Sequence, residues 1–381
     1  MIRSFLLAIP FSASVVSAEP IERIWLTHAT EDTSRIVVNW ETEKPSPSVV
    51  EFGPGPGLGE KSVLEGESTR HHVAIPLEHH DGRVHYRVGL GEEASAVHQF
   101  KNYPNDVLRV AVVGDWGFAQ GKDLGAIQRD DVHLLLTAGD NVPSLREPGK
   151  EGTKAFSALI DAYPELFRST PFLPILGNHD REIAPRGPMP PAEPVYDVEA
   201  RAYREFFALP GDEWKWQFAL SDFDLRFIAL DLNHIQDHGT TWQTCHAWQV
   251  DAPQFRWYAK TIKASEESFV VTLMNEKQTT VAGATKGAWH EQFRKGSALV
   301  TGFGYFAERS VIDGGLPYFN TCLKGDGDLY KDPNSQFHAR EDNYLLLTLR
   351  AGAPTMTVAL KKLDGTILDS IQIAKRAVRK D

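Results

Sequence analysis

The sequence lacks any excess of positive charge, and it contains no low-complexity tract and no internal repeat. It has 40 Lys and Arg residues against 51 Asp and Glu residues, which gives a formal net charge of −11 at pH 7. A chain with this balance offers no basic surface to a polyanion, so we expect no nucleic-acid partner. The simplest interpretation of the acidic balance is solubility. At 381 residues, the chain is long enough for two domains.

Long apolar runs are scarce as well. The one candidate is the N-terminal stretch MIRSFLLAIPFSASVVSAEP, with Arg3, an apolar run over residues 5–16 and small residues before Glu19. This run is shorter than the roughly 20 residues that span a bilayer, which argues against a membrane anchor. We predict a signal peptide over residues 1–18, and therefore a secreted or periplasmic protein with no membrane span.

Cysteine is rare: only Cys245 and Cys322 occur. In an oxidising compartment these two residues could form one disulfide, and two independent buried thiols are the alternative. The sequence does not show whether their Cα atoms lie within bonding distance. We favour the pair.

Residues 19–103 contain only strand signals. Short, partly alternating segments such as RIVVNWET and VHYRVGL are separated by turn residues. Short strands at this regular spacing predict a β-sandwich. The pattern changes after the NYPN segment at residues 102–105, and we place a domain boundary there.

From residue 107 onward, predicted strands alternate with predicted helices. Apolar residues recur at helical spacing over residues 154–167. Further helices are predicted over residues 199–208, 254–263 and 289–295, and strands over 223–233, 268–274 and 297–302. Near the C-terminus, two strands are joined at Asp364-Gly365, a strong hairpin signal.

Three short aliphatic segments each end in glycine followed by a polar side chain. VLRVAVVGD ends at Asp115, VHLLLTAGD ends at Asp140, and PFLPILGNH ends at Asn178 and His179. These segments are typical of buried parallel strands, and ligands gather at the carboxyl ends of such strands. Oxygen donors and one imidazole at a single sheet edge indicate a metal-assisted hydrolase.

Each of the four residues can be given a chemical role. Asp140 would bridge two metal ions, Asp115 would be a terminal ligand, and Asn178 would ligate through its amide oxygen. His179, not a ligand, would protonate the leaving group or stabilise charge in the transition state. Taken singly, the aspartates could be turn residues and the NHD segment a helix cap. Three such segments in order favour the site.

These segments resemble the calcineurin-like metallophosphoesterase superfamily and, within it, the purple acid phosphatase group. The family's GD-x-G element matches residues 114–117, its GD element matches residues 139–140, and its GNH-[DE] element matches residues 177–180. The resemblance covers nearly the whole mature chain. It implies an α/β fold, a four-layer αββα sandwich over residues 104–381, preceded by an all-β fibronectin-III-like domain over residues 19–103.

Other residues that the family pattern requires are replaced. Asn275 stands where a histidine is expected after the strand that ends in Met274, and Phe303 and Tyr305 stand at both histidine positions of a GH-x-H element. Pro143 replaces the tyrosine that would ligate ferric iron. We therefore expect no Fe(III)-tyrosinate site and no conventional two-metal centre, since removal of nitrogen ligands weakens zinc and iron binding most.

Nearby residues could substitute for the missing ligands. The candidates are His234, His238 and His246 after the strand at 223–233, together with His290 and Glu276. Metal ligands need accurate placement, so we expect these histidines to face solvent or to hydrogen-bond in the core. An all-oxygen site for Mg²⁺ or Ca²⁺ at Asp115, Asp140 and Asn178 is the better expectation. The sequence leaves the identity of a divalent metal open among Mg, Ca, Mn, Zn and Fe.

Two functional hypotheses follow. The first is an exported phosphomonoesterase that works with a reduced metal site, supported by the retained Asp115, Asp140, Asn178 and His179. The second is a catalytically silent family member that binds a small phosphorylated molecule, a glycan or a protein. Because the losses all fall on ligand positions, we favour loss of the ordinary phosphatase reaction.

Overall fold

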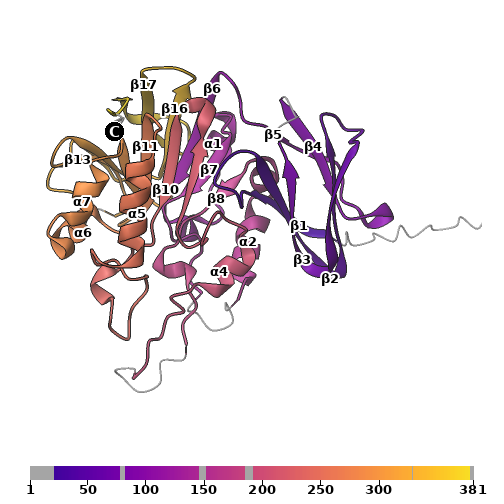
Figure 1. Cartoon of the computed structure of the whole chain (residues 1–381), viewed down its shortest axis with the longest axis horizontal. Coiled ribbons are helices and arrows are strands. Elements are labelled where there is room, and N and C mark those ends of the chain that lie inside the picture. The colour runs from indigo at the N-terminus through magenta and orange to yellow at the C-terminus, as the bar shows by residue number, and fades with distance from the viewer. Residues whose placement is uncertain (1–20, 78–81, 146–151, 185–191, 328, 378–381) are drawn as a thin grey trace, which may run out of the picture.

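The computed structural model describes residues 21–77, 82–145, 152–184, 192–327 and 329–377. The predicted signal peptide over residues 1–18 lies outside the described residues. Figure 1 shows an all-β N-terminal region beside a larger α/β region. Within the described residues, none of the helices has the length and apolar character needed to cross a membrane.

The N-terminal region is one five-stranded sheet in the order β1-β2-β4-β5, with β3 also paired to β2. Its strands are β1 (Ile21–Thr27), β2 (Arg35–Gly53), β3 (Glu60–Pro76), β4 (Arg83–Val88) and β5 (His98–Lys101). The pairing of β2 with β3 shifts register after Glu41, so Trp40 and Phe52 from its two halves reach the same core. The all-β prediction holds here, whereas the fibronectin-III-like identity and the domain boundary remain predictions.

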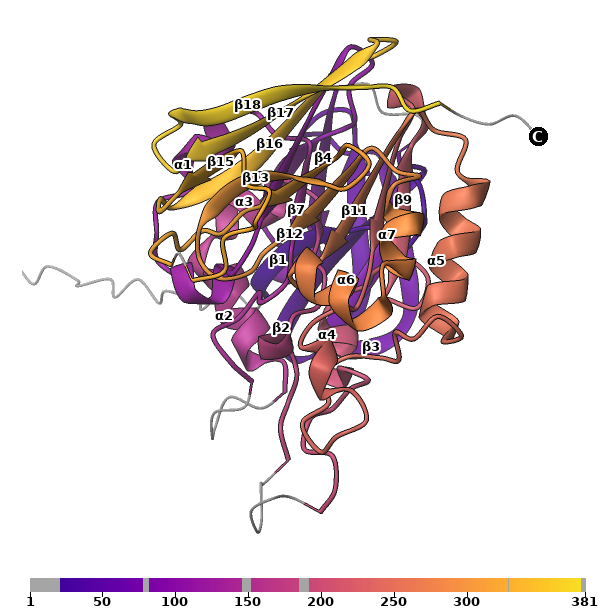
Figure 2. The same ribbon diagram turned by 90° about the vertical axis from the view of Figure 1, so that its left-hand side faces the viewer.

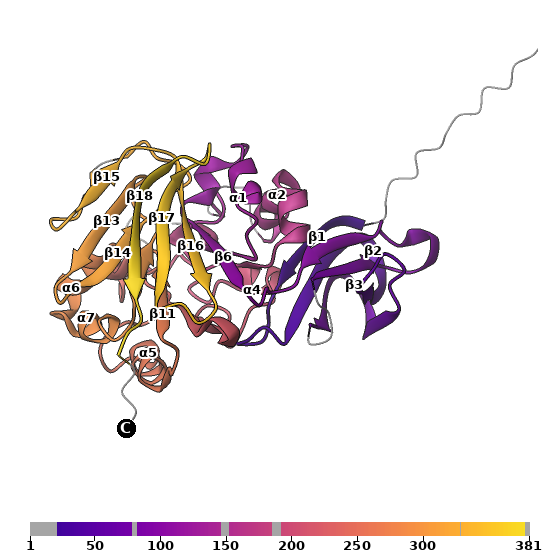
Figure 3. The same cartoon turned by 90° about the horizontal axis from the view of Figure 1, so that it is seen from above.

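Two further sheets form the larger region. The six-stranded sheet has the order β18 (Ile367–Ala374), β17 (Thr355–Lys362), β16 (Asn343–Arg350), β6 (Val107–Val113), β7 (Leu134–Thr137), β8 (Phe172–Leu173). The seven-stranded sheet has the order β15 (Phe337–Ala339), β13 (Ala307–Ile312), β14 (Leu316–Asn320), β12 (Ala298–Thr301), β11 (Phe269–Met274), β10 (Leu225–Ala229), β9 (Trp216–Leu220). Figure 3 shows β16, β17 and β18 side by side.

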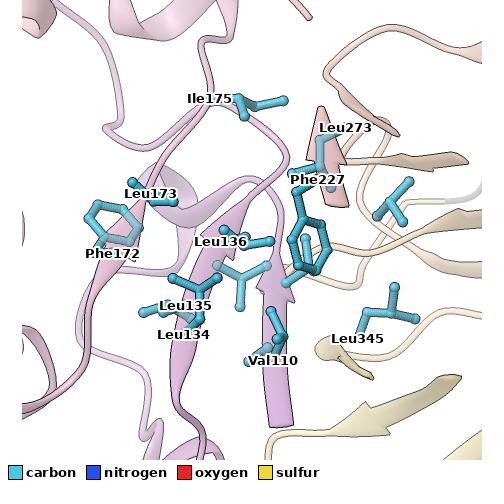
Figure 4. Close-up of a cluster of buried hydrophobic side chains, with 14 of the residues drawn as sticks. Val110, Leu134, Leu135, Leu136, Phe172, Leu173, Ile175, Phe227, Leu273 and Leu345 are labelled. Atoms are coloured by element: carbon cyan, nitrogen blue, oxygen red, sulfur yellow. The ribbon is translucent and has the colours of Figure 1, made fainter. Parts of the chain in front are cut away.

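The core of this region lies between its two sheets. Val110 and Leu136 from the six-stranded sheet belong to the same buried cluster as Phe227 and Leu273 from the seven-stranded sheet (Figure 4). Burial of such aliphatic and aromatic side chains is the main force that holds two sheets together. The prediction of a mixed α/β sandwich is confirmed.

The helices lie outside the sheets. They are α1 (Gly125–Arg129), α2 (Lys154–Ala162), α3 (Pro164–Ser169), α4 (Arg201–Phe206), α5 (Pro253–Ala264), α6 (Gln278–Thr285) and α7 (Ala288–Phe293). Side chains alternate between the faces of a strand, and Ile228 on β10 points away from Phe227 into a second cluster. That cluster contains Tyr258 of α5 and Trp289 of α7, so these helices cover the outer face of the seven-stranded sheet (Figure 2).

The N-terminal sheet packs directly against the larger region. The ring of Trp25 on β1 stacks on Phe206 of α4, with ring centroids 4.3 Å apart and planes 1° from parallel. Both side chains belong to the large core cluster. Close by, Ser157 Oγ of α2 donates a hydrogen bond of 2.8 Å to Glu41 Oε2 of β2. The two regions therefore share apolar core and polar contacts.

Candidate functional site

The ends of three strands meet closely at the predicted site. A Cβ atom on Gly114, after β6, would lie 2.7 Å from Gly302 Cα after β12 and 2.1 Å from the Thr321 carbonyl oxygen after β14. No side chain fits at these separations, so glycine is required at this position. The approach brings the segment after β12, with its replaced histidine positions, next to Asp115.

Asp115 and Asp140 follow adjacent parallel strands, β6 and β7. Both are buried, with 2% and 7% of their surface exposed, and both have left-handed φ values of 51° and 54°. Aspartate tolerates this backbone conformation better than most residues. The two carboxyl groups contact each other, and burial followed by the charge of Asp140 raises the pKa of Asp115 well above its usual value. Two carboxyl groups this close in a buried place oppose ionisation of Asp115.

Asn178 and His179 form a 3-10 turn after β8, and this turn contacts Asp140. The backbone N–H of His179 donates to Asp140 Oδ1 at 3.1 Å. The His179 side chain donates from Nδ1 to the Pro143 carbonyl oxygen at 2.5 Å, since a carbonyl only accepts. Asn178 is buried at the same strand end. The structure thus gathers the four predicted residues at one edge, while their metal-binding and catalytic roles remain predictions.

Asp180, the last residue of the third motif, has a structural role. Its carboxylate accepts hydrogen bonds from the backbone N–H of Gly177 at 2.8 Å and from the backbone and side-chain nitrogens of Asn141, both at 2.9 Å. Burial and the charge of Asp140 raise the pKa of Asp180. Asp180 therefore fastens the third motif to the residue that follows Asp140.

Asn275 occupies the position of the first missing histidine and is almost fully buried. Its Nδ2 donates to the Ala138 carbonyl oxygen at 2.8 Å and to the Gly302 carbonyl oxygen at 2.7 Å. Ala138 follows β7 and Gly302 follows β12, so one amide group connects the two packed sheets. Both hydrogens of this amide are used, and the side chain acts as a structural tie.

Aromatic rings occupy the other two histidine positions. The Phe303 ring lies edge-on to Tyr330, with centroids 5.0 Å apart, and the Tyr305 ring lies edge-on to Phe118 at 5.4 Å. Burial, followed by the negative charges of Asp115 and Asp140, raises the pKa of Tyr305. Tyr305 is thus a neutral phenol beside the carboxyl pair, and deprotonation for metal binding would be costly.

Cys322 is a site residue that the sequence reasoning missed. Its Sγ donates to Asp115 Oδ2 at 2.7 Å, and burial followed by the neighbouring Asp115 raises the pKa of this thiol. Cys245 and Cys322 are both buried free thiols. The favoured disulfide is therefore wrong, because Cys322 is committed to the carboxyl pair. The only local sign of this role in the sequence is that Cys322 lies two residues after a strand.

The substitute ligands considered above are engaged elsewhere. The contacts are His234 with Asp237 (3.9 Å), His238 with Gln249 (3.0 Å), His246 with Asp231 (2.7 Å), His290 with Gln278 (2.8 Å), and Glu276 with the N–H of Ile235 (3.1 Å). The expectation of core-bonded or solvent-facing histidines is confirmed for this set.

The donor set does not fit a dinuclear zinc or iron centre. Across the described residues, no three His, Cys, Asp or Glu side chains are grouped so that they could hold a metal ion. Asp115, Asp140 and Asn178 offer oxygen atoms only, and the three positions that would supply nitrogen carry an amide and two aromatic rings. A site with few ligands and no imidazole binds zinc or iron weakly.

Lysines and aromatic rings lie beside the carboxyl pair. Lys324 Nζ lies 5.1 Å from the Tyr305 ring centroid and 5.9 Å from that of Phe118, and Lys277 Nζ lies 5.6 Å from that of Tyr330. Lys324 Nζ also lies 3.5 Å from Asp326 Oδ2. The rim of the site therefore presents two lysine side chains, one of them paired with a carboxylate, and apolar rings.

Comparison with protein families gives one match that bears on the site. Residues 108–293 match the model of the calcineurin-like phosphoesterase family. This range contains Asp115, Asp140, Asn178 and His179, so the resemblance identified from the motifs is confirmed. A search of curated proteins gives no match.

Among solved structures, the fold is similar to a purple acid phosphatase from yellow lupin (Lupinus luteus) seeds. The identity is 16%, the match covers 93% of this chain and 74% of that chain, and the TM-score is 0.69. GAP50, the anchor in the inner membrane complex of Plasmodium, matches with 12% identity, 72% and 90% coverage and a TM-score of 0.49. At such identities, the likeness shows the fold alone.

Proposed function

We propose that this chain, whose residues 108–293 belong to the calcineurin-like phosphoesterase family, has lost the dinuclear-metal phosphatase reaction and uses its strand-end site to bind a small phosphorylated molecule. We propose further that it is exported after cleavage of residues 1–18, and that residues 19–103 are a fibronectin-III-like domain. The reaction that we propose to be lost is phosphomonoester hydrolysis.

The observation that carries the proposal is the double hydrogen bond of Asn275. Its Nδ2 donates to the carbonyl oxygens of Ala138 and Gly302, at 2.8 and 2.7 Å. A single imidazole nitrogen carries at most one hydrogen, so a histidine cannot make both bonds from one atom. The position that would ligate metal has become part of the scaffold.

The carboxyl pair supports the same conclusion. Asp115 accepts a hydrogen bond from the Cys322 thiol at 2.7 Å and contacts Asp140. One oxygen of the pair therefore already has a hydrogen-bond donor from the protein. A ligand would bind at the rim, where Lys324 and Lys277 supply positive charge and Tyr305 supplies an apolar face.

A second candidate is a phosphoesterase with one oxygen-bound Mg²⁺ or Ca²⁺. The observation that favours it is that Asp115, Asp140 and Asn178 lie after three adjacent parallel strands. Magnesium and calcium accept carboxylate, amide and water oxygens without imidazole. In this case His179 would act as the proton donor.

One experiment separates the two candidates. The purified mature protein is analysed for metals and assayed with an aryl phosphate from acidic to neutral pH, with Zn, Fe, Mn, Mg or Ca added. We expect no turnover above that of Asp140→Ala. Turnover in the natural sequence that disappears in Asp140→Ala would overturn the proposal, and its metal dependence would identify the second candidate.

The binding half of the proposal needs its own measurement. Calorimetry measures the affinity for the same aryl phosphate. This affinity should fall about tenfold in Lys324→Gln, because a hydrogen bond to a charged group is lost. Lys286→Gln removes an exposed charge elsewhere and should leave binding unchanged. Equal binding by all three proteins would contradict a ligand at this rim.

Restoring the three histidines tests whether their replacement is the cause of the proposed loss of metal binding. The triple variant Asn275→His, Phe303→His, Tyr305→His should gain zinc binding, whereas each single variant should gain little because the ligands act as a set. A single Asn275→His variant that binds zinc as well as the triple variant would show that Asn275 alone had blocked the centre.

A further inference from the structure

A second polar pocket lies where the N-terminal sheet meets the six-stranded sheet. It has a volume of about 580 Å³, and its walls include Arg83, Lys101, Tyr103 and His133. His133 directly precedes β7, whereas Asp140 follows that strand, so the pocket and the candidate site lie at opposite edges of the sheet. This pocket is separate from the site described above.

Like charges face each other across the pocket wall. Arg83 opens β4 and Lys101 closes β5, and the two residues are directly paired in the antiparallel ladder. Like charges at paired positions repel unless a counter-charge lies nearby. Lys101 forms an ion pair with Asp131, but in the described part of the chain no carboxylate pairs with the side chain of Arg83. Among the described residues, the Arg83 guanidinium at the pocket therefore has no carboxylate partner.

The floor of the pocket adds donors from the larger region. The backbone N–H of Arg109 on β6 donates to His133 Nδ1 at 3.2 Å, and the N–H of His133 donates to the Arg109 carbonyl oxygen at 2.9 Å. Because Nδ1 accepts, the neutral His133 ring carries its hydrogen on Nε2. Burial, followed by the charges of Lys101 and Arg109, lowers the pKa of His133 to about 4. His133 is thus an uncharged donor at neutral pH.

The charges around the pocket leave a local excess of positive charge. The cations are Arg83, Lys101 and Arg109, and the carboxylates that act on the same groups are Asp131 and Asp106. The Asp106 carboxylate accepts a hydrogen bond from the N–H of Val107 at 2.7 Å, and Asp131 forms an ion pair with Lys101. Such an excess stands out in a chain with a net charge of −11.

We propose that this pocket binds a phosphate group, either as inorganic phosphate or as the phosphate of a small molecule. A tetrahedral dianion matches the guanidinium of Arg83, the ammonium group of Lys101 and the imidazole N–H of His133 in one pocket, since guanidinium binds phosphate through paired hydrogen bonds. The volume is within the range of small-molecule sites. Bound there, the anion would join β4 and β5 of the N-terminal sheet to His133 of the larger region.

Calorimetric titration of the full chain at pH 7.5 tests the proposal, with inorganic phosphate, glycerol phosphate and acetate as probes. We expect saturable binding of at least one of the two phosphates and none of acetate. Arg83→Gln should weaken phosphate binding about tenfold or more, because it removes a charge-assisted hydrogen bond. Arg83 is exposed, so this variant leaves the core unchanged.

A matched control decides the outcome. Lys61→Gln removes an exposed charge from β3, away from the pocket, and should leave the affinity unchanged. Tighter binding of glycerol phosphate than of inorganic phosphate would support a phosphorylated small molecule, and the reverse order would support the free anion. No saturable phosphate binding, equal binding of acetate, or an affinity insensitive to Arg83→Gln would overturn the proposal.

Discussion

The thiol of Cys322 donates a hydrogen bond to Asp115 across 2.7 Å, although the two residues are 207 positions apart in the sequence. This bond joins the end of the β14 segment to the end of β6. It also places a soft, uncharged donor on an oxygen that would otherwise face a cation. The bond therefore gives one oxygen of Asp115 a hydrogen-bond partner inside the protein.

The first prediction concerns the reactivity of both cysteines. Cys245 and Cys322 are buried free thiols, and burial raises the pKa of each. Only the thiolate reacts readily, so a thiol reagent should modify neither residue in the folded protein and both after denaturation. The measurement is thiol counting with and without denaturant. A count of zero under non-reducing denaturing conditions would restore the disulfide.

The second prediction concerns Asn275. Replacement by alanine leaves the carbonyl oxygens of Ala138 and Gly302 without their donor at a buried position. We expect Asn275→Ala to lower the free energy of unfolding by about 1–3 kcal/mol. Denaturant titration measures the change, with the exposed Asn334→Ala as control. An unchanged midpoint for Asn275→Ala would remove its role as a tie between the sheets.

The third prediction concerns the ion pair between Arg181 and Asp231. The two groups are 2.7 Å apart and both are fully buried. Arg181→Met would leave the Asp231 carboxylate without its cation and should cost about 3–5 kcal/mol of unfolding free energy. The pair of the exposed Arg201 with Asp197 is the control: Arg201→Met should cost less than about 1 kcal/mol. Comparable costs for both variants would contradict this difference.

The fourth prediction concerns pH. His28 donates from Nδ1 to the Arg35 carbonyl oxygen at 2.6 Å and pairs through Nε2 with the Tyr103 hydroxyl at 2.8 Å. Burial lowers the pKa of His28 to about 4. As the pH falls below about 6.5, the unfolded chain takes up this proton and the folded chain does not, so folding stability falls between pH 6.5 and 4. The loss is at most about 1.4 kcal/mol per pH unit.

Thermal unfolding at several pH values tests this linkage. The melting temperature should fall from pH 6.5 to pH 4.5 less steeply in His28→Gln than in the natural sequence, while the exposed His234→Gln keeps the natural slope. Parallel curves for the natural sequence and His28→Gln would show that His28 does not contribute to the pH dependence.

The fifth prediction concerns colour. The resemblance found in the sequence implies a tyrosine ligand for ferric iron at the position of Pro143, whose carbonyl oxygen accepts the His179 hydrogen bond. The purified protein should therefore show no visible tyrosinate-to-iron absorption, even after incubation with ferric iron. Visible spectroscopy measures this, and a purple preparation would contradict the absence of that ligand.

The sequence predicted the parts of the structure that local patterns determine. The strand ends at Asp115, Asp140 and Asn178 were found because short aliphatic runs end there in glycine and a polar residue. Even so, the predicted helix over residues 154–167 is divided into α2 and α3, because Pro164 begins a new helix. Local spacing alone did not show this break.

The contacts that the sequence did not predict are long-range ones. Nothing near Cys322 indicates that its thiol faces Asp115, and nothing near Asn275 shows which carbonyl oxygens its amide reaches. Such bonds depend on how the two sheets pack. No local pattern in a single sequence shows that packing. For the same reason, the position of His246 beside Asp231 could be established only from the structure.

The stacking of Trp25 on Phe206 has a consequence for how the chain unfolds. Because Trp25 is fully buried and belongs to the core of the larger region, release of the N-terminal sheet would open that core to water. The N-terminal sheet should therefore not unfold separately, and the chain should melt cooperatively, with one calorimetric peak in place of two.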